Sequence, residues 1–79
     1  MSRIESKILE LKMLEIFDRT KRNCRSYEKE GKEIGLINEI GCLVGVAYCL
    51  QAAGFNPTED TEFLRLINIQ QELKAKDNN

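Results

Sequence analysis

The stretch that decides the fold runs from Ile34 to Phe55, IGLINEIGCLVGVAYCLQAAGF, and it is apolar almost throughout. Gly41, Gly45, Cys49 and Ala53 recur along it at every fourth position. Because residues four apart share one face of an α-helix, this spacing predicts a helix with bulky side chains on one side and very small ones on the other. A small side lets a second backbone come unusually close, so we interpret it as an association surface.

This apolar helix is expected from about residue 33 to residue 53, at the centre of the fold. Its bulky side gathers Leu36, Ile37, Ile40, Leu43, Val44, Ala47, Tyr48 and Leu50. Its small side gathers Gly35, Gly41, Cys42, Gly45, Cys49, Ala52 and Ala53. A glycine within a helix costs roughly 1 kcal/mol relative to alanine, so we expect close packing to offset this cost at Gly41 and Gly45. On this interpretation Cys42, Cys49 and Tyr48 are core residues.

A longer helix is expected before it, from about residue 2 to residue 30, because this segment contains neither proline nor glycine. Gly31 is placed to end that helix in the left-handed conformation and to turn the chain back. One apolar stripe of the helix comprises Leu9, Met13, Ile16, Phe17, Thr20, Cys24 and Tyr27. A shorter stripe of Ile4, Ile8, Leu11 and Leu14 lies on the opposite side. The N-terminal half of this helix is therefore expected to have two partners.

A third, shorter helix is expected from about residue 57 to residue 75. Asn56-Pro57-Thr58-Glu59 has the pattern of a helix start, with Asn56 as the N-cap, Pro57 at the first helical position and Glu59 at the capping-box position. The sequence thus predicts an all-α chain: a long first helix, an antiparallel apolar second helix and a shorter third helix in a single domain, 1–79. Seventy-nine residues supply little core, so we expect a homo-oligomeric helical bundle, most simply a dimer.

The expected interface between copies comprises Gly41, Gly45, Cys49, Ala52 and Ala53. Whether this small side meets the first helix of the same chain or the second helix of another copy stays open at this point. A membrane span is disfavoured, because about 16 usable residues give roughly 24 Å of helix against a hydrocarbon core of about 30 Å.

Composition excludes several classes of function. The chain has no histidine, three cysteines without ligand spacing and no phosphate-binding glycine loop. We therefore expect no enzyme activity, no metal and no cofactor. An odd number of cysteines and the lack of a leader pattern suggest a reducing, cytoplasmic location. Cys24, close in sequence to Arg22 and Arg25, is the one thiol for which a lowered pKa is expected.

Charge is unevenly distributed although the formal net charge is -1. Residues 1–32 contain nine Lys or Arg and six Asp or Glu, giving +3, whereas residues 33–79 contain three and seven, giving -4. Basic side chains gather on the first helix at Arg19, Lys21, Arg22, Arg25 and Lys29. Such a group is a possible site for a nucleic acid or a nucleotide, or else a solvated helix surface. Glu59, Asp60 and Glu62 are explained by the dipole of the third helix.

The leading functional hypothesis is a small non-enzymatic regulatory protein that binds another protein, as an inhibitor or adaptor of the kind carried by phages, mobile elements or bacteria. The alternative is an oligomer that binds nucleic acid or a nucleotide through the basic face of the first helix.

Overall fold

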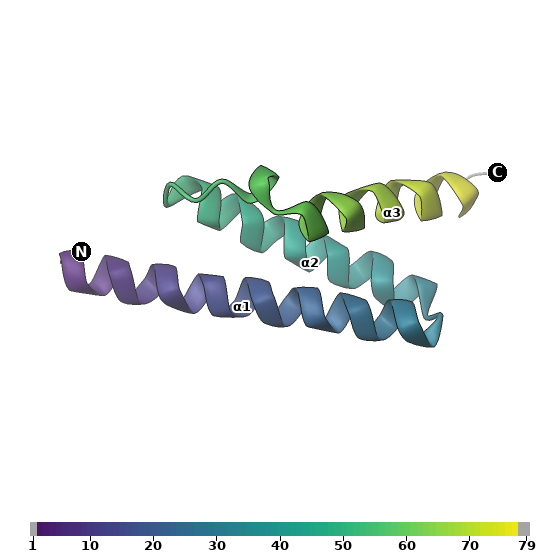
Figure 1. Ribbon diagram of the computed structural model, residues 1–79, viewed down its shortest axis with the longest axis horizontal. Helices are drawn as coiled ribbons and strands as arrows, with labels where there is room; N and C mark the ends of the chain where they lie inside the picture. The colour runs from purple at the N-terminus through teal and green to yellow at the C-terminus, as the bar shows by residue number, and fades with distance from the viewer. Residues whose placement is uncertain (1, 78–79) are drawn as a thin grey trace.

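The computed structural model describes residues 2–77 as three α-helices and one short 3-10 turn (Figure 1). The helices are α1 (Arg3–Glu30), α2 (Glu33–Ala52) and α3 (Thr61–Asp77), and the 3-10 turn η1 (Pro57–Glu59) lies between α2 and α3. No strand occurs within these residues. The predicted all-α, three-helix chain is confirmed.

α1 and α2 form an antiparallel hairpin. The Oγ of Ser2 caps α1 by accepting a hydrogen bond from the Glu5 N–H at 3.1 Å. Gly31 ends the helix with φ +72°, and the Lys32 N–H donates to the Tyr27 carbonyl at 3.0 Å. This left-handed glycine is the predicted turn, and it sets α2 back along α1.

The core lies where α2 meets both neighbours. It comprises Phe17, Cys24, Leu36, Ile40, Leu43, Ala47, Leu50, Phe63 and Leu66, with buried Thr20 beside it. The ring of Phe17 is in contact with two other aromatic rings, its centroid being 5.9 Å from that of Phe55 and 5.7 Å from that of Phe63. The Thr20 hydroxyl donates to the Ile16 carbonyl at 2.8 Å, which satisfies the buried polar group.

α3 begins later than expected, at Thr61 rather than near Pro57. Asn56 does act as a cap, but its side chain accepts from the Thr58 N–H at the start of η1, which lasts only three residues. Asp60 then has an extended backbone, and its Oδ1 accepts from the Phe63 N–H at 2.9 Å. Asp60 is therefore the N-cap of α3. It is a second capping side chain, four residues after Asn56, and α3 begins directly after it.

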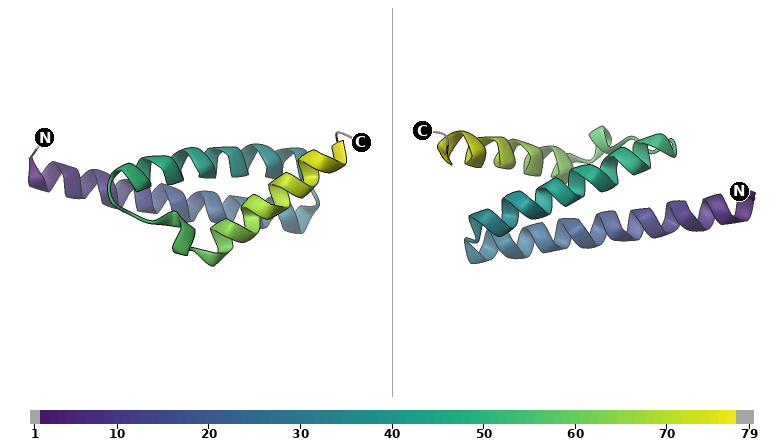
Figure 2. Two further views of the ribbon diagram at one scale, coloured as in Figure 1. Left: turned by 90° about the horizontal axis from the view of Figure 1, so that it is seen from above. Right: turned by 180° about the vertical axis from the view of Figure 1, so that it is seen from behind.

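α3 crosses α2 (Figure 2). It reaches α1 through Phe63, whose ring lies against that of Phe17, and through the Arg25–Glu62 and Glu28–Arg65 ion pairs. Besides Phe63 and Leu66, it contributes half-buried Ile67, Ile69 and Leu73 to the core. The Gln70 amide also donates to the Ile37 carbonyl at 3.1 Å. α3 thus covers one side of the hairpin.

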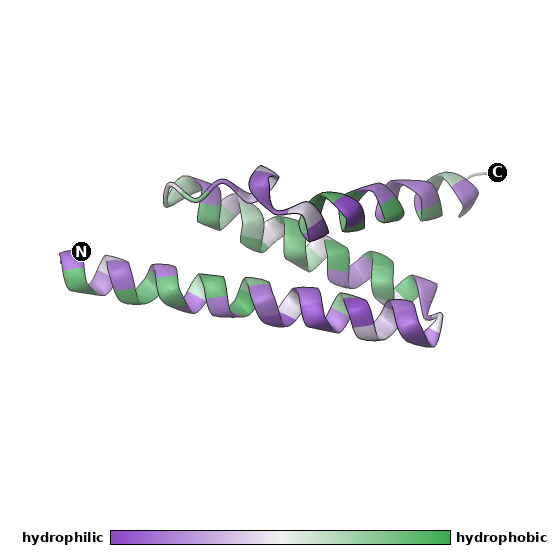
Figure 3. Cartoon of the chain, in the orientation of Figure 1, coloured by the Kyte–Doolittle hydropathy of each residue, from purple (hydrophilic) through white to green (hydrophobic). Residues whose placement is uncertain are grey.

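The molecule is 49 Å long and about 20 Å across, and the first turns of α1 extend beyond its other elements. Figures 1 and 3 show this N-terminal part of α1, with its apolar residues, projecting past the end of α2. Ile4, Ile8 and Leu11 in the first part of α1 are exposed, so the second partner expected for this segment is not supplied by residues 2–77. Leu9 and Ile16 of the main stripe are also exposed, at 45% and 38%.

Candidate interaction surfaces

The outer face of α2 is the first surface of interest. It comprises the exposed residues Ile34, Asn38, Gly41, Cys42, Gly45, Tyr48, Cys49 and Ala52. None of them is charged, although a helix face in contact with water normally carries charged side chains. α1 and α3 cover one side of α2, and the other side stays open in the single chain, so the small side at Gly41 and Gly45 does not meet the first helix of the same chain.

Tyr48, Cys42 and Cys49 are therefore not core residues. Tyr48 is 69% exposed, and both thiols are exposed. The sequence placed Tyr48 with the bulky side because it lies at the edge of that side, and periodicity alone does not say how far the neighbouring helices reach around α2.

Within the single chain, close packing at glycine occurs at Gly35 and at neither of the two expected positions, Gly41 and Gly45. A Cβ added to Gly35 would lie 3.0 Å from the ring of Tyr27, so α1 and α2 approach closely at that point. A Cβ added to Gly41 or Gly45 would meet no atom within 4 Å. Within the described chain nothing offsets the helix cost of these two glycines, which is consistent with an unmet contact on the outer face.

All five residues predicted for the interface between copies are exposed in the single chain. Gly41 and Gly45 lie on the open outer face. Cys49, Ala52 and Ala53 line a hollow of about 400 Å³ between the end of α2 and Leu9 and Met13 of α1. Part of the predicted interface thus lies next to apolar residues of α1. The sequence alone did not indicate that these two groups of residues are neighbours.

α2 is also long and apolar enough, by length and composition alone, to cross a membrane, and 28% of its most apolar window is buried in the structure. The core helix of a soluble protein passes the same test.

The pKa of the Cys24 thiol is shifted in the direction opposite to that expected. Burial raises the pKa of Cys24 to about 11, and the nearby carboxylates of Glu39, Glu62 and Glu28 add to the rise. The expected lowering by Arg22 and Arg25 was wrong, because Cys24 is directed into the core and not toward those arginines.

The basic residues of α1 do not form one surface. Lys21 Nζ lies 2.7 Å from Asp60 Oδ2, and Arg25 Nη1 donates to both carboxylate oxygens of Glu62 at 2.9 and 3.0 Å. One turn further on, Arg65 of α3 makes a two-bond contact with Glu28, at 2.9 and 3.1 Å. Two of the five predicted anion-binding residues are therefore engaged within the chain.

The other three, Arg19, Arg22 and Lys29, are exposed, and none of them takes part in an ion pair with another residue of the described range. They lie on the side of α1 that faces away from α2. Three separated cations without an aromatic residue among them make a weak site for a nucleic acid.

The Lys21–Asp60 pair is the least exposed ion pair in the described chain, with the two side chains 13% and 21% exposed. Burial alone would raise the pKa of Asp60, but hydrogen bonds from Lys21 and from the Phe63 N–H outweigh it, and the pKa is lowered. Burial would likewise lower the pKa of Lys21, yet its hydrogen bond and attraction to Asp60 raise it. Each partner is thus held in its charged form.

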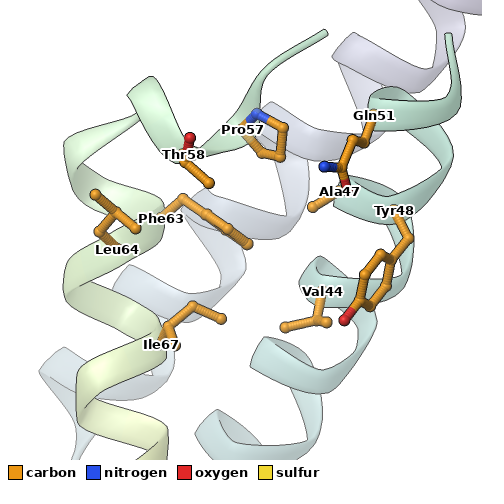
Figure 4. Close-up of a pocket in the computed structure, with 9 residues that line it drawn as sticks. All are labelled: Val44, Ala47, Tyr48, Gln51, Pro57, Thr58, Phe63, Leu64 and Ile67. Atoms are coloured by element: carbon orange, nitrogen blue, oxygen red, sulfur yellow. The ribbon is translucent and has the colours of Figure 1, made fainter. Parts of the chain in front are cut away.

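A groove between α2 and α3 is the surface that sequence reasoning missed. It has a volume of about 260 Å³ and is lined by Val44, Ala47, Tyr48, Gln51, Pro57, Thr58, Phe63, Leu64 and Ile67. Figure 4 shows Phe63 and Ile67 of α3 facing Val44 of α2, with Pro57 at one end. No single helix carries this pattern, because the groove forms only when α3 crosses α2.

The chain matches no known family model, no curated protein and no solved structure. Among residues 2–77, no three histidine, cysteine, aspartate or glutamate side chains gather closely enough to hold a metal ion.

Proposed function

We propose that this protein is a non-enzymatic binding protein that works through protein–protein contacts, as a cytoplasmic inhibitor or adaptor. The observation that carries the proposal is the outer face of α2, a full-length helix surface without a charged residue that neither α1 nor α3 covers. An uncharged and mostly apolar surface of this kind on a small chain marks an interaction site.

The contact that suits this face best is another helix at short distance. Gly41 and Gly45 have open space where a side chain would be, and Cys49 and Ala52 continue the row with small side chains. A helix packed here gains van der Waals contact along its backbone. The proposed first occupant is α2 of a second copy in a two-fold dimer, and the second is a helix of a foreign partner.

Gly45→Leu tests the proposal. No atom lies within 4 Å of the added Cβ, so the single chain should fold, and helix propensity should stabilise it by about 0.5–1 kcal/mol. A leucine side chain at position 45 keeps the backbone of a second helix from approaching closely. We therefore expect the sedimentation mass of the variant to fall to that of one chain at concentrations where the native protein associates.

Ser26→Leu is a matched control, since Ser26 is exposed on the side of α1 away from α2. It should leave association unchanged. The proposal fails if the native protein stays a single chain without detergent at all concentrations and retains no protein partner that Gly45→Leu loses. A requirement for detergent would indicate instead that α2 enters a membrane.

The competing function is binding of a nucleic acid or a nucleotide by α1. It now depends on Arg19, Arg22 and Lys29, because Lys21 is paired with Asp60 and Arg25 with Glu62. It predicts salt-sensitive binding of RNA, DNA or a nucleotide that weakens on Arg22→Ala. Lack of binding at low salt removes it without affecting the outer face of α2.

A further inference from the structure

We propose that Cys42 and Cys49 on the outer face of α2 form disulfide bonds with a second copy of the chain. Cys42 of each copy bonds to Cys49 of the other, and the two bonds lock a pair of antiparallel α2 helices together when the protein is oxidised. The proposal rests on the proposed function, since it concerns the same contact of α2 and assigns its regulation.

The two thiols face solvent and cannot pair with each other. Both are exposed, and they lie seven positions apart on one helix, about 10.5 Å along its axis. A disulfide requires Cα atoms about 4.4–6.8 Å apart. The third thiol of the chain, Cys24, is buried in the core. An exposed partner sulfur for Cys42 and Cys49 therefore comes from a second molecule.

Their positions around α2 suit a two-fold antiparallel contact. At about 100° per residue, Cys42 and Cys49 lie about 60° and 40° from Gly45, on the same flank of the outer face. A two-fold axis perpendicular to the plane of two antiparallel helices keeps this flank on one side of the contact in both copies. When the axis passes between residues 45 and 46, Cys42 of one copy lies level with Cys49 of the other. The match occurs twice, once on each side of the axis.

Gly45 sets the distance between the helices. It lies on the line of closest approach, and a Cβ added there would meet no atom within 4 Å. Helices that pack closely have axes about 8 Å apart. At that separation, with Cα atoms about 2.3 Å from each axis, the facing Cys42 and Cys49 Cα atoms lie about 5 Å apart. This distance falls within the range of a disulfide.

A second copy is the occupant that these positions favour. An isologous contact places the same surface on both sides, so one pair of thiols per chain is matched completely. A foreign helix would need two cysteines of its own at the same spacing. None of the exposed residues on this face is charged, so two copies meet without repulsion between like charges.

The size of the contact explains why a covalent bond matters. With the axis between residues 45 and 46, two α2 helices that end at Ala52 overlap along roughly 20 Å, over a width of about 10 Å. Such a contact buries roughly a few hundred Å² per copy, less than the about 800 Å² of a standard interface. The helix pair alone is therefore weak, and oxidation determines how much dimer is present.

Hydrogen peroxide is the oxidant in this proposal. The thiolate of one cysteine attacks a peroxide oxygen and breaks the O–O bond, which gives a sulfenic acid and hydroxide, and the hydroxide takes up the thiol proton to become water. The facing thiol attacks the sulfenic sulfur, forms the S–S bond and releases a second water. Each bond thus consumes two thiols and one peroxide. A reducing dithiol reverses the bond by exchange, so in a reducing cytoplasm it is transient.

Complementation between two variants tests the proposal. Cys42→Ser and Cys49→Ser each leave one thiol at the face, which in the antiparallel pair lies opposite a serine. After peroxide treatment, each variant alone should form covalent dimer at least about tenfold more slowly than the native chain on a non-reducing gel. An equimolar mixture should form mixed dimers within about fivefold of the native rate, because one Cys42–Cys49 pair is then restored. Both positions are exposed, and circular dichroism checks that each variant folds.

Several outcomes overturn the inference: either variant alone cross-links at the native rate, the mixture cross-links no faster than its components, or Cys42 bonds to Cys24 within one chain. Gly45→Leu keeps the helices apart and should slow covalent dimerisation about tenfold; an unchanged rate also overturns the inference. If the reduced protein associates, or retains a partner, in a way that Gly45→Leu abolishes, while peroxide forms no Cys42–Cys49 bond, the inference fails and the proposed function stands.

Discussion

Asp60 holds α3 in place in two ways, and its removal is the most informative perturbation of the fold. Its Oδ1 caps α3 by accepting from the Phe63 N–H, and its Oδ2 pairs with Lys21 of α1 at 2.7 Å. Asp60→Asn keeps a side chain that caps helices well but removes the charge opposite Lys21. Asp60→Ala removes both the cap and the charge.

The expected losses follow from these two contacts. A hydrogen bond to a charged group contributes about 1.5–3 kcal/mol, and the pair is partly exposed, so Asp60→Asn should lower the free energy of unfolding by about 1–2 kcal/mol. Asp60→Ala should cost about 1 kcal/mol more, the contribution of an N-cap. Both changes are measurable against a total of about 4–12 kcal/mol for a chain of this length.

The effect of Asp60→Asn should depend on pH in a defined direction. The pKa of Asp60 is lower in the folded chain than in the unfolded one, so its stabilisation is present above the unfolded value of about 3.9 and is lost as the pH falls through the folded value. The pKa of Lys21 is raised, so its contribution is lost only as the pH rises through a folded value above about 10.4. The difference between native and Asp60→Asn chains should be full near pH 7 and small near pH 2.

Urea unfolding followed by circular dichroism at both pH values measures this difference. Asp18→Asn is the matched control, because Asp18 also lies near Lys21, at 3.6 Å, but its side chain is 63% exposed. It should cost less than about 0.5 kcal/mol. An Asp60→Asn variant as stable as the Asp18→Asn variant at pH 7, or a difference that does not shrink in acid, would refute the role given to this pair.

Two further outcomes are expected. Phe17→Ala should destabilise the chain by about 3–5 kcal/mol and remove its cooperative thermal transition, because the ring is 1% exposed and packs on Phe55 and Phe63. Phe17→Leu, which keeps most of the buried volume, should retain the transition. In the folded single chain at pH 8, a thiol reagent should modify exposed Cys42 and Cys49 quickly and Cys24 only on unfolding. The reason is that Cys24 is buried and that burial raises its pKa to about 11. Equal rates of modification at all three thiols would contradict the burial of Cys24 in the core.

The helices could be predicted because their signals are local. The run without glycine or proline, the left-handed Gly31 and the apolar periodicity each depend on neighbouring residues. The start of α3 was misplaced for the same reason. Asn56 and Asp60 are both good caps, and only packing decides which of them precedes α3. Local sequence gives the candidates for a boundary but not the choice between them.

The surfaces were less predictable, because α2 is apolar on nearly every side. Periodicity groups residues on a face, but it does not say which face of such a helix meets its neighbours. Tyr48 was therefore placed in the core and is exposed, while Gly35 was grouped with Gly45 and is packed against Tyr27. The groove depends on residues from two helices and a turn, so no window of sequence contains it.

Residues 1–32 carry a net positive charge and residues 33–79 a net negative one, and ion pairs between α1 and residues 60–65 bring the opposite charges together. Lys21, Arg25 and Glu28 lie along one side of α1 and meet residues 37–39 positions away in sequence: Asp60, just before α3, and Glu62 and Arg65 within it. The Arg25–Glu62 and Glu28–Arg65 pairs are exposed and contribute about 0–1 kcal/mol each, less than the buried side chains of Phe63 and Leu66, which hold α3 on the hairpin. Salt that weakens these pairs should therefore lower the free energy of unfolding by no more than about 2 kcal/mol in total and leave α3 packed on α2.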